Sequence, residues 1–454
     1  RGVELRRVEY VPVETPSDAY GSQGHWPDPL PPLKEALQLR PGQNVPMWVA
    51  ISAPRSQTPG LYRGEIEILQ GSRRVAGVPL VVRVLDFTLP AEPTVETAYG
   101  VSPERRYFGP VSDAQFRRIH DLTMQLCARY RISPYYPHRG ANFRYTFEGD
   151  PPRAVLDFSA FDSAMTRYLD GLHFTTFNVG GLPAELDGHK RGTPEYERLF
   201  RDVFGRVQEH LRERGWLRKA YWYWVDEPPI SQYDDVKKGM ALLKRACPDI
   251  RRLLTCNQED APVPEFYGLV NLWVPILDRY NPDLAHARQK LGETVWWYVC
   301  TGPKAPYPNN FIDHPAVNHR IRFWMLDRYG VDGSLYWSIT YWRQSPWEQA
   351  MSVSPSGGNW GNGDGRLLYP PRRTIPNEPV VEAPVPSIRL ECLRDGLEDV
   401  ELLHALRRSG DAESLQLVQR AENALVPTLT CFEQNPALLQ GWRLVVGRVA
   451  ETVR

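Results

Sequence analysis

Short apolar runs alternate with longer amphipathic stretches over residues 94–341. Eight of the runs have the length and the β-branched or aromatic content of strands: 95–101, 129–136, 173–179, 220–226, 252–257, 270–276, 294–301 and 334–341. Stretches with helical periodicity lie between most of them, at 113–127, 158–169, 194–214, 233–246, 283–291 and 315–329. Strands that alternate with helices form parallel sheets, and eight such units over about 250 residues predict an α/β (β/α)8 TIM-like barrel. An open doubly wound sheet is the alternative, but no GxGxxG motif follows the first strand, which counts against a dinucleotide-binding version.

The segment before the barrel has a different pattern. Strand-like runs at 44–52, 60–69 and 75–85 are separated by Gly and Pro, which predicts a small all-β sandwich as an accessory domain. We therefore expect a β-sandwich domain over 1–93 and a barrel domain over 94–454. A glycine-rich stretch predicts an ordered loop over the barrel mouth, and three helices are expected to close the barrel: 357–365 for the loop, and 387–405, 411–424 and 435–452 for the helices.

Composition excludes several classes of function. Lys+Arg and Asp+Glu are equal at 54 each, which argues against nucleic acid or an anionic membrane as a partner. No apolar run reaches membrane-spanning length. The chain begins at Arg1 without a signal-like segment, so its location is not readable from its start. The six cysteines form no CxxC or Cys/His cluster, which predicts buried thiols, and we expect neither a metal nor a cofactor.

The run Trp222-Tyr223-Trp224-Val225-Asp226-Glu227-Pro228-Pro229 carries the chemistry. An aromatic strand ends in two carboxylates, and proline prevents it from continuing. In a barrel, catalytic residues collect at the carboxyl ends of the strands. The chain also has 14 Trp and 22 Tyr, whose flat rings suit sugars. These features predict a sugar-cleaving enzyme, and the alternative is a surface Asp-Glu turn after a core strand.

The adjacency of Asp226 and Glu227 favours one mechanism of glycoside cleavage. A covalent retaining enzyme needs two carboxylates about 5–5.5 Å apart on opposite sides of the bond, and sequence neighbours on a strand point to opposite faces. A substrate with a 2-acetamido group supplies its own nucleophile. Glu227 is then the acid and base, and Asp226 stabilises the acetamido group. The seventh strand, 294–301, ends without a carboxylate, although Asp278 after the sixth strand keeps a covalent mechanism open.

Other strand ends offer side chains for binding sugar. Amides at the third and fifth strands, a carboxylate in the glycine-rich loop and aromatic residues at the seventh and eighth strands are the candidates: Asn178, Asn257, Asp364, Trp297, Tyr298, Trp337, Tyr341 and Trp342. Tyr298 is the choice for a hydrogen bond to the acetamido carbonyl, and Trp337, Tyr341 and Trp342 for a wall beneath the sugar. Loop-capping amides, a plain turn and core packing are the competing interpretations, and about half of the aromatic run at 296–298 should face helices because sides alternate along a strand.

Three segments make the chain resemble glycoside hydrolase family 123 and the glycosidase-like proteins around it. They are 224–228 (WVDEP); 333–337 (GSLYW) with 311–315 (FIDHP) before it; and 363–365 (GDG) followed by 386–399 (PSIRLECLRDGLED). The resemblance runs from about Val75 to about Ala405. It implies a retaining β-N-acetylgalactosaminidase that uses substrate assistance, with Asp226 as the stabilising residue and Glu227 as the acid/base.

The expected partner is thus a glycan with a terminal β-linked N-acetylhexosamine, and a secreted or periplasmic location is favoured for such an enzyme. Two alternatives stay open. One is a hydrolase for a sugar without the acetamido group, with a covalent nucleophile such as Asp278. The other is a carbohydrate-binding protein without catalysis, although an intact Asp226–Glu227 pair speaks against it.

Overall fold

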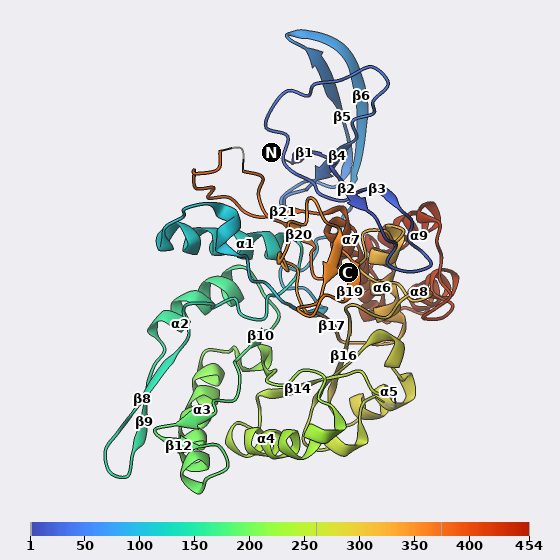
Figure 1. Ribbon diagram of the computed structural model, residues 1–454. Coiled ribbons are helices and arrows are strands. Elements are labelled where there is room, and N and C mark those ends of the chain that lie inside the picture. The colour runs from blue at the N-terminus through green and yellow to red at the C-terminus, as the bar shows by residue number, and fades with distance from the viewer. Residues whose placement is uncertain (1, 260, 374, 454) are drawn as a thin grey trace.

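The computed structural model describes residues 2–259, 261–373 and 375–453. Its centre is a sheet of seven parallel strands that forms a nearly closed barrel (Figure 1). The strands follow one another around the barrel in the order β10 (Phe177–Asn178), β13 (Ala220–Trp222), β14 (Arg251–Cys256), β15 (Leu272–Pro275), β16 (Thr294–Val299), β17 (Gly333–Tyr336) and β7 (Glu96–Tyr99). Each overlaps one of the eight runs that the sequence predicts as strands.

The remaining predicted strand, 129–136, the second in chain order, is reduced to a short bridge between β7 and β10. The amide of Tyr99 donates to the carbonyl of Ser133 over 2.9 Å, and the amide of Tyr135 donates back to Tyr99 over 2.9 Å. On the other side, the amide of Asn178 donates to the carbonyl of Tyr135 over 2.8 Å. This segment occupies the place of an eighth strand without the length of one, because only residues near 133–135 keep the parallel pairing.

Side chains that alternate along the strands separate the barrel interior from the outer core. On β16, Trp296 and Tyr298 belong to the inner cluster, which also holds Ala98, Tyr221, Leu253, Leu272, Val274 and Leu335. Trp297 belongs to the large outer cluster that the helices cover. This follows from the two-residue period of a strand.

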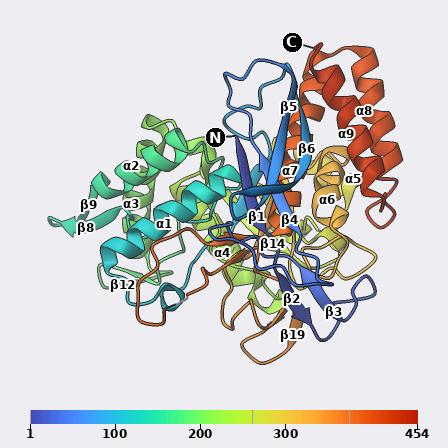
Figure 2. The ribbon, with the colours of Figure 1, turned by 90° about the horizontal axis from the view of Figure 1, so that it is seen from above.

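Helices cover the outside of the barrel (Figure 2). They are α1 (Asp113–Arg129), α2 (Ser159–Met165), α3 (Pro194–Glu213), α4 (Tyr233–Ala246), α5 (Pro282–Gln289), α6 (Val317–Arg328), α7 (Ile388–Ser409), α8 (Ala412–Leu425) and α9 (Pro436–Ala450). α7 begins after Ser387, whose hydroxyl accepts from the amide of Leu390 at 3.2 Å, so the predicted N-cap is confirmed. α7 packs on α6, and α8 and α9 pack on α7.

The N-terminal part forms small antiparallel sheets, so the predicted sandwich over 1–93 is not confirmed. The pairs are β1 (Val3–Arg7) with β4 (Met47–Ile51), β2 (Tyr10–Val13) with β3 (Gly24–Pro27), and β5 (Gly60–Gln70) with β6 (Arg73–Val84). Figure 1 shows β5 and β6 projecting from the rest of the molecule. The hairpin carries one apolar face, on which Ile68 is 43% and Val78 is 50% exposed. A sandwich needs a second sheet over such a face. The domain boundary at residue 93 stays a prediction.

The residues before β4 also contact the barrel rim. Asp28 forms a buried ion pair with Arg389 over 2.8 Å, and the Arg389 guanidinium also donates to the carbonyl of Gly363 over 2.9 Å. The glycine-rich stretch is ordered, because its residues Asn359–Asn362 form β19, which pairs with β18 (Met351–Val353). Its predicted position over the barrel mouth stays a prediction. The remaining strands form two-stranded antiparallel sheets: β8 (Arg144–Glu148) with β9 (Arg153–Asp157), β11 (Glu185–Leu186) with β12 (His189–Lys190), and β20 (Leu368–Tyr369) with β21 (Val385–Pro386).

Candidate active site

Asp226 and Glu227 lie in the loop that follows β13, at the carboxyl end of the barrel. The regular strand ends at Trp222, earlier than the predicted end at residue 226. Glu227 has a φ of 40°, in the left-handed region that side chains other than glycine rarely adopt. This conformation costs about 1–3 kcal/mol and needs support from its surroundings. The turn removes the strand geometry that would send two neighbouring side chains to opposite faces.

The Asp226 carboxylate is held through one of its oxygens. Oδ1 accepts a hydrogen bond from the hydroxyl of Tyr223 at 2.6 Å and another from the hydroxyl of Thr255 at 2.9 Å. Asp226 is otherwise exposed. The two bonds orient the carboxylate, and no described residue donates a hydrogen bond to Oδ2.

The Glu227 carboxyl group is half-buried and accepts hydrogen bonds on both oxygens. The Tyr298 hydroxyl donates to Oε1, and the side-chain amide of Asn257 donates to Oε2 over 3.0 Å. Burial raises the pKa of Glu227 above its ordinary range, and the nearby Asp226 carboxylate adds to the rise, while the two donors lower it. A carboxyl group with a raised pKa is suited to give a proton and take it back.

The two aromatic residues predicted on β16 go to opposite sides of the barrel wall. Tyr298 points inward and bonds to Glu227, where the sequence predicted a bond to the substrate. Trp297 is 2% exposed and packs edge-on against Tyr280, with ring centroids 5.3 Å apart. The prediction that Trp297 lines the mouth is therefore corrected, because strand alternation turns it toward the helices.

An aromatic cluster lies beyond β17. Trp337 and Tyr341 are 4.9 Å apart between ring centroids, and Trp360 on β19 lies 5.3 Å from Trp337 and 5.5 Å from Tyr341. All three rings are partly exposed. The sequence predicted Trp337 and Tyr341 as a wall but missed Trp360, for which the only signal was a tryptophan within a glycine-rich loop.

Trp342 does not join this cluster. It is 0% exposed, its indole nitrogen donates to the carbonyl of Leu368 over 2.7 Å, and its ring packs on Tyr107. The prediction that it forms part of the wall is corrected, because a fully buried ring offers no face to a sugar. Core packing is its role.

Asp364 is a buried carboxyl group directly behind the aromatic cluster. Its Oδ1 accepts from the Trp337 indole nitrogen at 3.1 Å and from the Tyr336 hydroxyl at 3.0 Å. Within the described part of the chain, Oδ2 has no hydrogen-bond partner. Burial raises the pKa of Asp364 to about 6, although these two donors and Lys304 act in the opposite direction. Gly365 allows this packing, because a Cβ there would lie 2.3 Å from the Trp337 ring.

Asn178 is a structural amide. Its nitrogen donates to the hydroxyl of Tyr136 at 2.8 Å and to the carbonyl of Tyr223 at 3.0 Å. Its oxygen accepts from the amides of Tyr223 at 3.0 Å and Gly180 at 3.2 Å. All four hydrogen-bonding positions of the amide are used. The prediction that it binds a sugar hydroxyl is corrected in favour of loop capping, which ties the ends of β10 and β13 together.

Cys300 and Asp278 are two further titratable groups that differ in their relation to Glu227. Burial raises the pKa of the Cys300 thiol, just past β16, to about 12, and the carboxyl groups of Asp364 and Glu227 add to the rise. Asp278 lies on the 3-10 turn η6 (Leu277–Arg279) and, among the described residues, makes no hydrogen bond to Asp226 or Glu227. Residues 2–259, 261–373 and 375–453 contain no cluster of three His, Cys, Asp or Glu side chains able to hold a metal ion.

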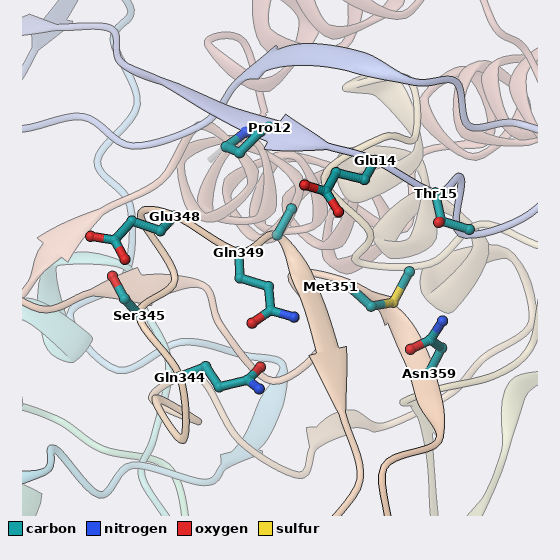
Figure 3. A pocket seen from close by; sticks show the side chains of 10 residues that line it. Pro12, Glu14, Thr15, Gln344, Ser345, Glu348, Gln349, Met351 and Asn359 are labelled. Carbon is teal, nitrogen blue, oxygen red and sulfur yellow. The ribbon is translucent and has the colours of Figure 1, made fainter.

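A cavity of about 630 Å³ lies apart from these residues (Figure 3). Its lining includes Glu14 from the segment after β2, Gln344 and Gln349 from the loop before β18, and Asn359 on β19. Neither Asp226 nor Glu227 lines it. The chemistry of the carboxyl groups, and not the volume of a cavity, therefore identifies the candidate active site.

A parallel barrel with two carboxyl side chains at its carboxyl rim and exposed aromatic rings nearby is the architecture of a barrel glycoside hydrolase. The family model described as "Glycoside hydrolase 123, catalytic domain" matches residues 178–406, half of the 454-residue chain. The chain belongs to glycoside hydrolase family 123.

A solved structure shares this fold. A family 123 glycoside hydrolase from Clostridium perfringens matches with a TM-score of 0.68 and 16% identity, over 99% of this chain and 86% of that one. A family 39 glycoside hydrolase from Bacteroides cellulosilyticus WH2 matches with a TM-score of 0.38 and 11% identity, over 87% and 77% of the two chains. The second score is too low to support an argument. No curated protein matches the sequence. Among the described residues, no helix combines the length and apolar character needed to cross a bilayer.

Proposed function

We propose that this family 123 hydrolase releases terminal β-linked N-acetylgalactosamine from glycans by a retaining, substrate-assisted mechanism. The observation that carries the proposal is the pair Asp226 and Glu227, held side by side by the turn at Glu227 but in different surroundings. Asp226 is exposed and oriented through one oxygen, whereas Glu227 is half-buried with a raised pKa. Two neighbouring carboxyl groups that differ in burial are suited to two different roles in one reaction.

Glu227 is the acid and base of the proposed reaction. In the first step, the 2-acetamido carbonyl oxygen attacks the anomeric carbon while Glu227 gives its proton to the leaving oxygen, which forms an oxazolinium ring. In the second step, ionised Glu227 takes a proton from water, which attacks the same carbon and opens the ring. Two displacements at one carbon retain its configuration.

Asp226 acts on the acetamido group. Its free Oδ2 accepts the amide N–H and so directs the carbonyl oxygen to the anomeric carbon. The negative charge then stabilises the cation that develops on the ring. Tyr223 and Thr255, which both donate to Oδ1, keep the carboxylate in that orientation.

The aromatic cluster Trp337, Tyr341 and Trp360 supplies a surface for the glycan, and Asp364 holds the Trp337 indole from behind. Because Asp364 is 0% exposed, its predicted contact with a sugar hydroxyl is not part of the proposal. The C. perfringens protein is described in terms of glycolipid glycan hydrolysis, and a glycan with an accessible β-N-acetylgalactosamine end is the substrate class that we propose here. A hydrolase that acts through a covalent Asp278 is the second candidate, although that carboxylate shares no hydrogen bond with the pair among the described residues.

The test is hydrolysis of p-nitrophenyl β-N-acetylgalactosaminide beside the β-N-acetylglucosaminide, β-galactoside and β-glucoside, with a thiazoline that mimics the oxazoline as inhibitor. We expect cleavage of the acetamido sugars alone, with preference for N-acetylgalactosamine, and inhibition by the thiazoline. Cleavage of the plain galactoside or glucoside would move the nucleophile onto the protein and overturn the mechanism. Sugar binding without cleavage would favour a carbohydrate-binding protein.

A further inference from the structure

One buried hydroxyl group connects the two carboxylate residues. Thr255 is the fifth residue of β14 and is 1% exposed. Its Oγ1 accepts a hydrogen bond from the backbone amide of Glu227 at 2.9 Å and donates one to Oδ1 of Asp226 at 2.9 Å. The neighbouring strand thereby contacts both members of the pair through a single atom.

We propose that Thr255 is a positioning residue that sets the orientation of Asp226 and Glu227 relative to each other. The inference rests on the proposed function, because it assigns a role in the reaction of that site. The Thr255 hydroxyl makes both of these bonds to the carboxylate residues themselves, and Thr255 is 1% exposed. Its effect on the reaction is exerted through the two carboxylate residues.

Thr255 Oγ1 accepts one of its two hydrogen bonds and donates the other, and this difference links Asp226 to Glu227. A threonine hydroxyl has one proton, and an amide N–H can only donate. Because the Glu227 amide donates to Oγ1, the hydroxyl proton points to Asp226 Oδ1. The same bond that orients Asp226 therefore depends on the backbone of Glu227. Tyr223 is the second donor to Oδ1, but it contacts only Asp226 of the pair.

The bond to the backbone also supports the unusual conformation of Glu227. With a φ of 40°, this residue relaxes to ordinary backbone angles unless its surroundings prevent it. The β-branched side chain of Thr255 has few χ1 states on a strand, so it presents the hydroxyl in a constant direction. Without the hydroxyl, the amide loses its partner and the turn is free to move both carboxylates.

The experiment compares Thr255→Val, which keeps the shape and removes the hydroxyl, with Thr255→Ser, which keeps the hydroxyl. Thr123→Val is the matched control, because Thr123 is a fully buried threonine on α1 whose hydroxyl bonds to the carbonyl of Ile119 away from the site. Two quantities are measured for each variant: kcat and KM on the p-nitrophenyl acetamido sugar, and hydrogen exchange of the Glu227 amide in protein labelled with ¹⁵N-glutamate.

In Thr255→Val we expect kcat to fall about 100-fold, as misplacement of reacting groups by about 1 Å can cause. KM should change little, and the Glu227 amide should exchange about tenfold faster because it loses a hydrogen bond. In Thr255→Ser, kcat and the exchange rate of the Glu227 amide should both lie close to the wild-type values. In Thr123→Val, both should equal those of the wild type.

Two outcomes overturn the proposal. One is an unchanged Glu227 exchange rate in Thr255→Val. The other is an equal loss of kcat in Thr255→Val and Thr123→Val, which would indicate general destabilisation. The exchange measurement does not depend on catalysis. If the wild type cleaves no glycoside but Thr255→Val still releases the Glu227 amide and Thr255→Ser restores it, the proposed function fails while the structural role of Thr255 stands.

Discussion

The side-chain amide of Asn257 donates a hydrogen bond to Oε2 of Glu227 over 3.0 Å, from the end of β14 to the loop after β13. The sequence placed Asn257 against a sugar hydroxyl, whereas the structure places it against the proposed acid/base. A donor to a carboxylate favours the ionised form, so Asn257 opposes the effect of burial on the pKa of Glu227.

The pH profile provides a test of this contact. In Asn257→Ala the carboxylate loses a donor, so we expect the pKa of Glu227 to rise further. The proposed first step needs protonated Glu227, and activity on the alkaline side ends as this group ionises. The alkaline limb of kcat/KM should therefore move to higher pH. A limb that stays in place or moves to lower pH would contradict the assignment of Glu227 as the acid.

Removal of the acid itself has a larger effect. Glu227→Gln keeps the size of the side chain and an acceptor for Tyr298, but it cannot transfer a proton. We expect kcat/KM to fall about 10²–10⁴-fold, the usual contribution of a positioned acid or base. The thermal unfolding midpoint should stay near that of the wild type, which separates lost chemistry from lost folding. Retained hydrolysis would refute the role of Glu227.

The stabilising carboxylate can be tested by removing its charge. Asp226→Asn keeps an oxygen for the hydroxyls of Tyr223 and Thr255 while the negative charge is lost. We expect a loss of about 10²–10³ in kcat, the size expected for one preorganised electrostatic contact. The thiazoline inhibitor should bind more weakly as well. Full activity with undiminished inhibition would place the stabilising group elsewhere.

The proposed binding surface can be tested with two tryptophans, one in the aromatic cluster and one in the core. Trp360 is partly exposed within the aromatic cluster, whereas Trp342 is fully buried. Trp360→Ala should raise KM with little change in unfolding free energy, because it removes a surface for the glycan. Trp342→Ala should lower the unfolding free energy by about 3–5 kcal/mol, as core tryptophans do. Denaturant unfolding and steady-state kinetics on both variants decide between the two roles, and the reverse pattern would contradict them.

The buried Asp364 predicts a pH-dependent stability. Its pKa is raised from 3.8 to about 6 in the folded protein, so the folded state binds its proton more tightly than the unfolded state does. The stabilising contribution is complete below pH 3.8 and is lost as pH rises through about 6, a change of about 3 kcal/mol. Asp364→Asn cannot ionise, so it should gain stability relative to the wild type between pH 4 and 7. Parallel curves of unfolding free energy against pH would show that Asp364 does not titrate as described.

Local pattern predicted most of the barrel. The runs around β13, β14, β15 and β16 were visible because each is a short apolar segment rich in β-branched or aromatic residues. The second run, 129–136, was visible too, but only its last residues pair in the structure. The N-terminal strands β5 and β6 were predicted as strands, and they pair with each other across a short turn. The predicted sandwich is not confirmed, because packing of one sheet on another depends on contacts between distant segments.

The sequence by itself determined which chemistry is present: an Asp-Glu pair stopped by proline after a strand, and aromatic residues near the other strand ends. Tertiary structure alone decided which of them meet. Tyr298 and Asn257 converge on Glu227, Trp360 joins Trp337, and Trp297 and Trp342 turn into the core. The physical reason is that residue type and strand end follow from local pattern, whereas a side chain's partner depends on barrel register and on backbone turns such as the positive φ of Glu227.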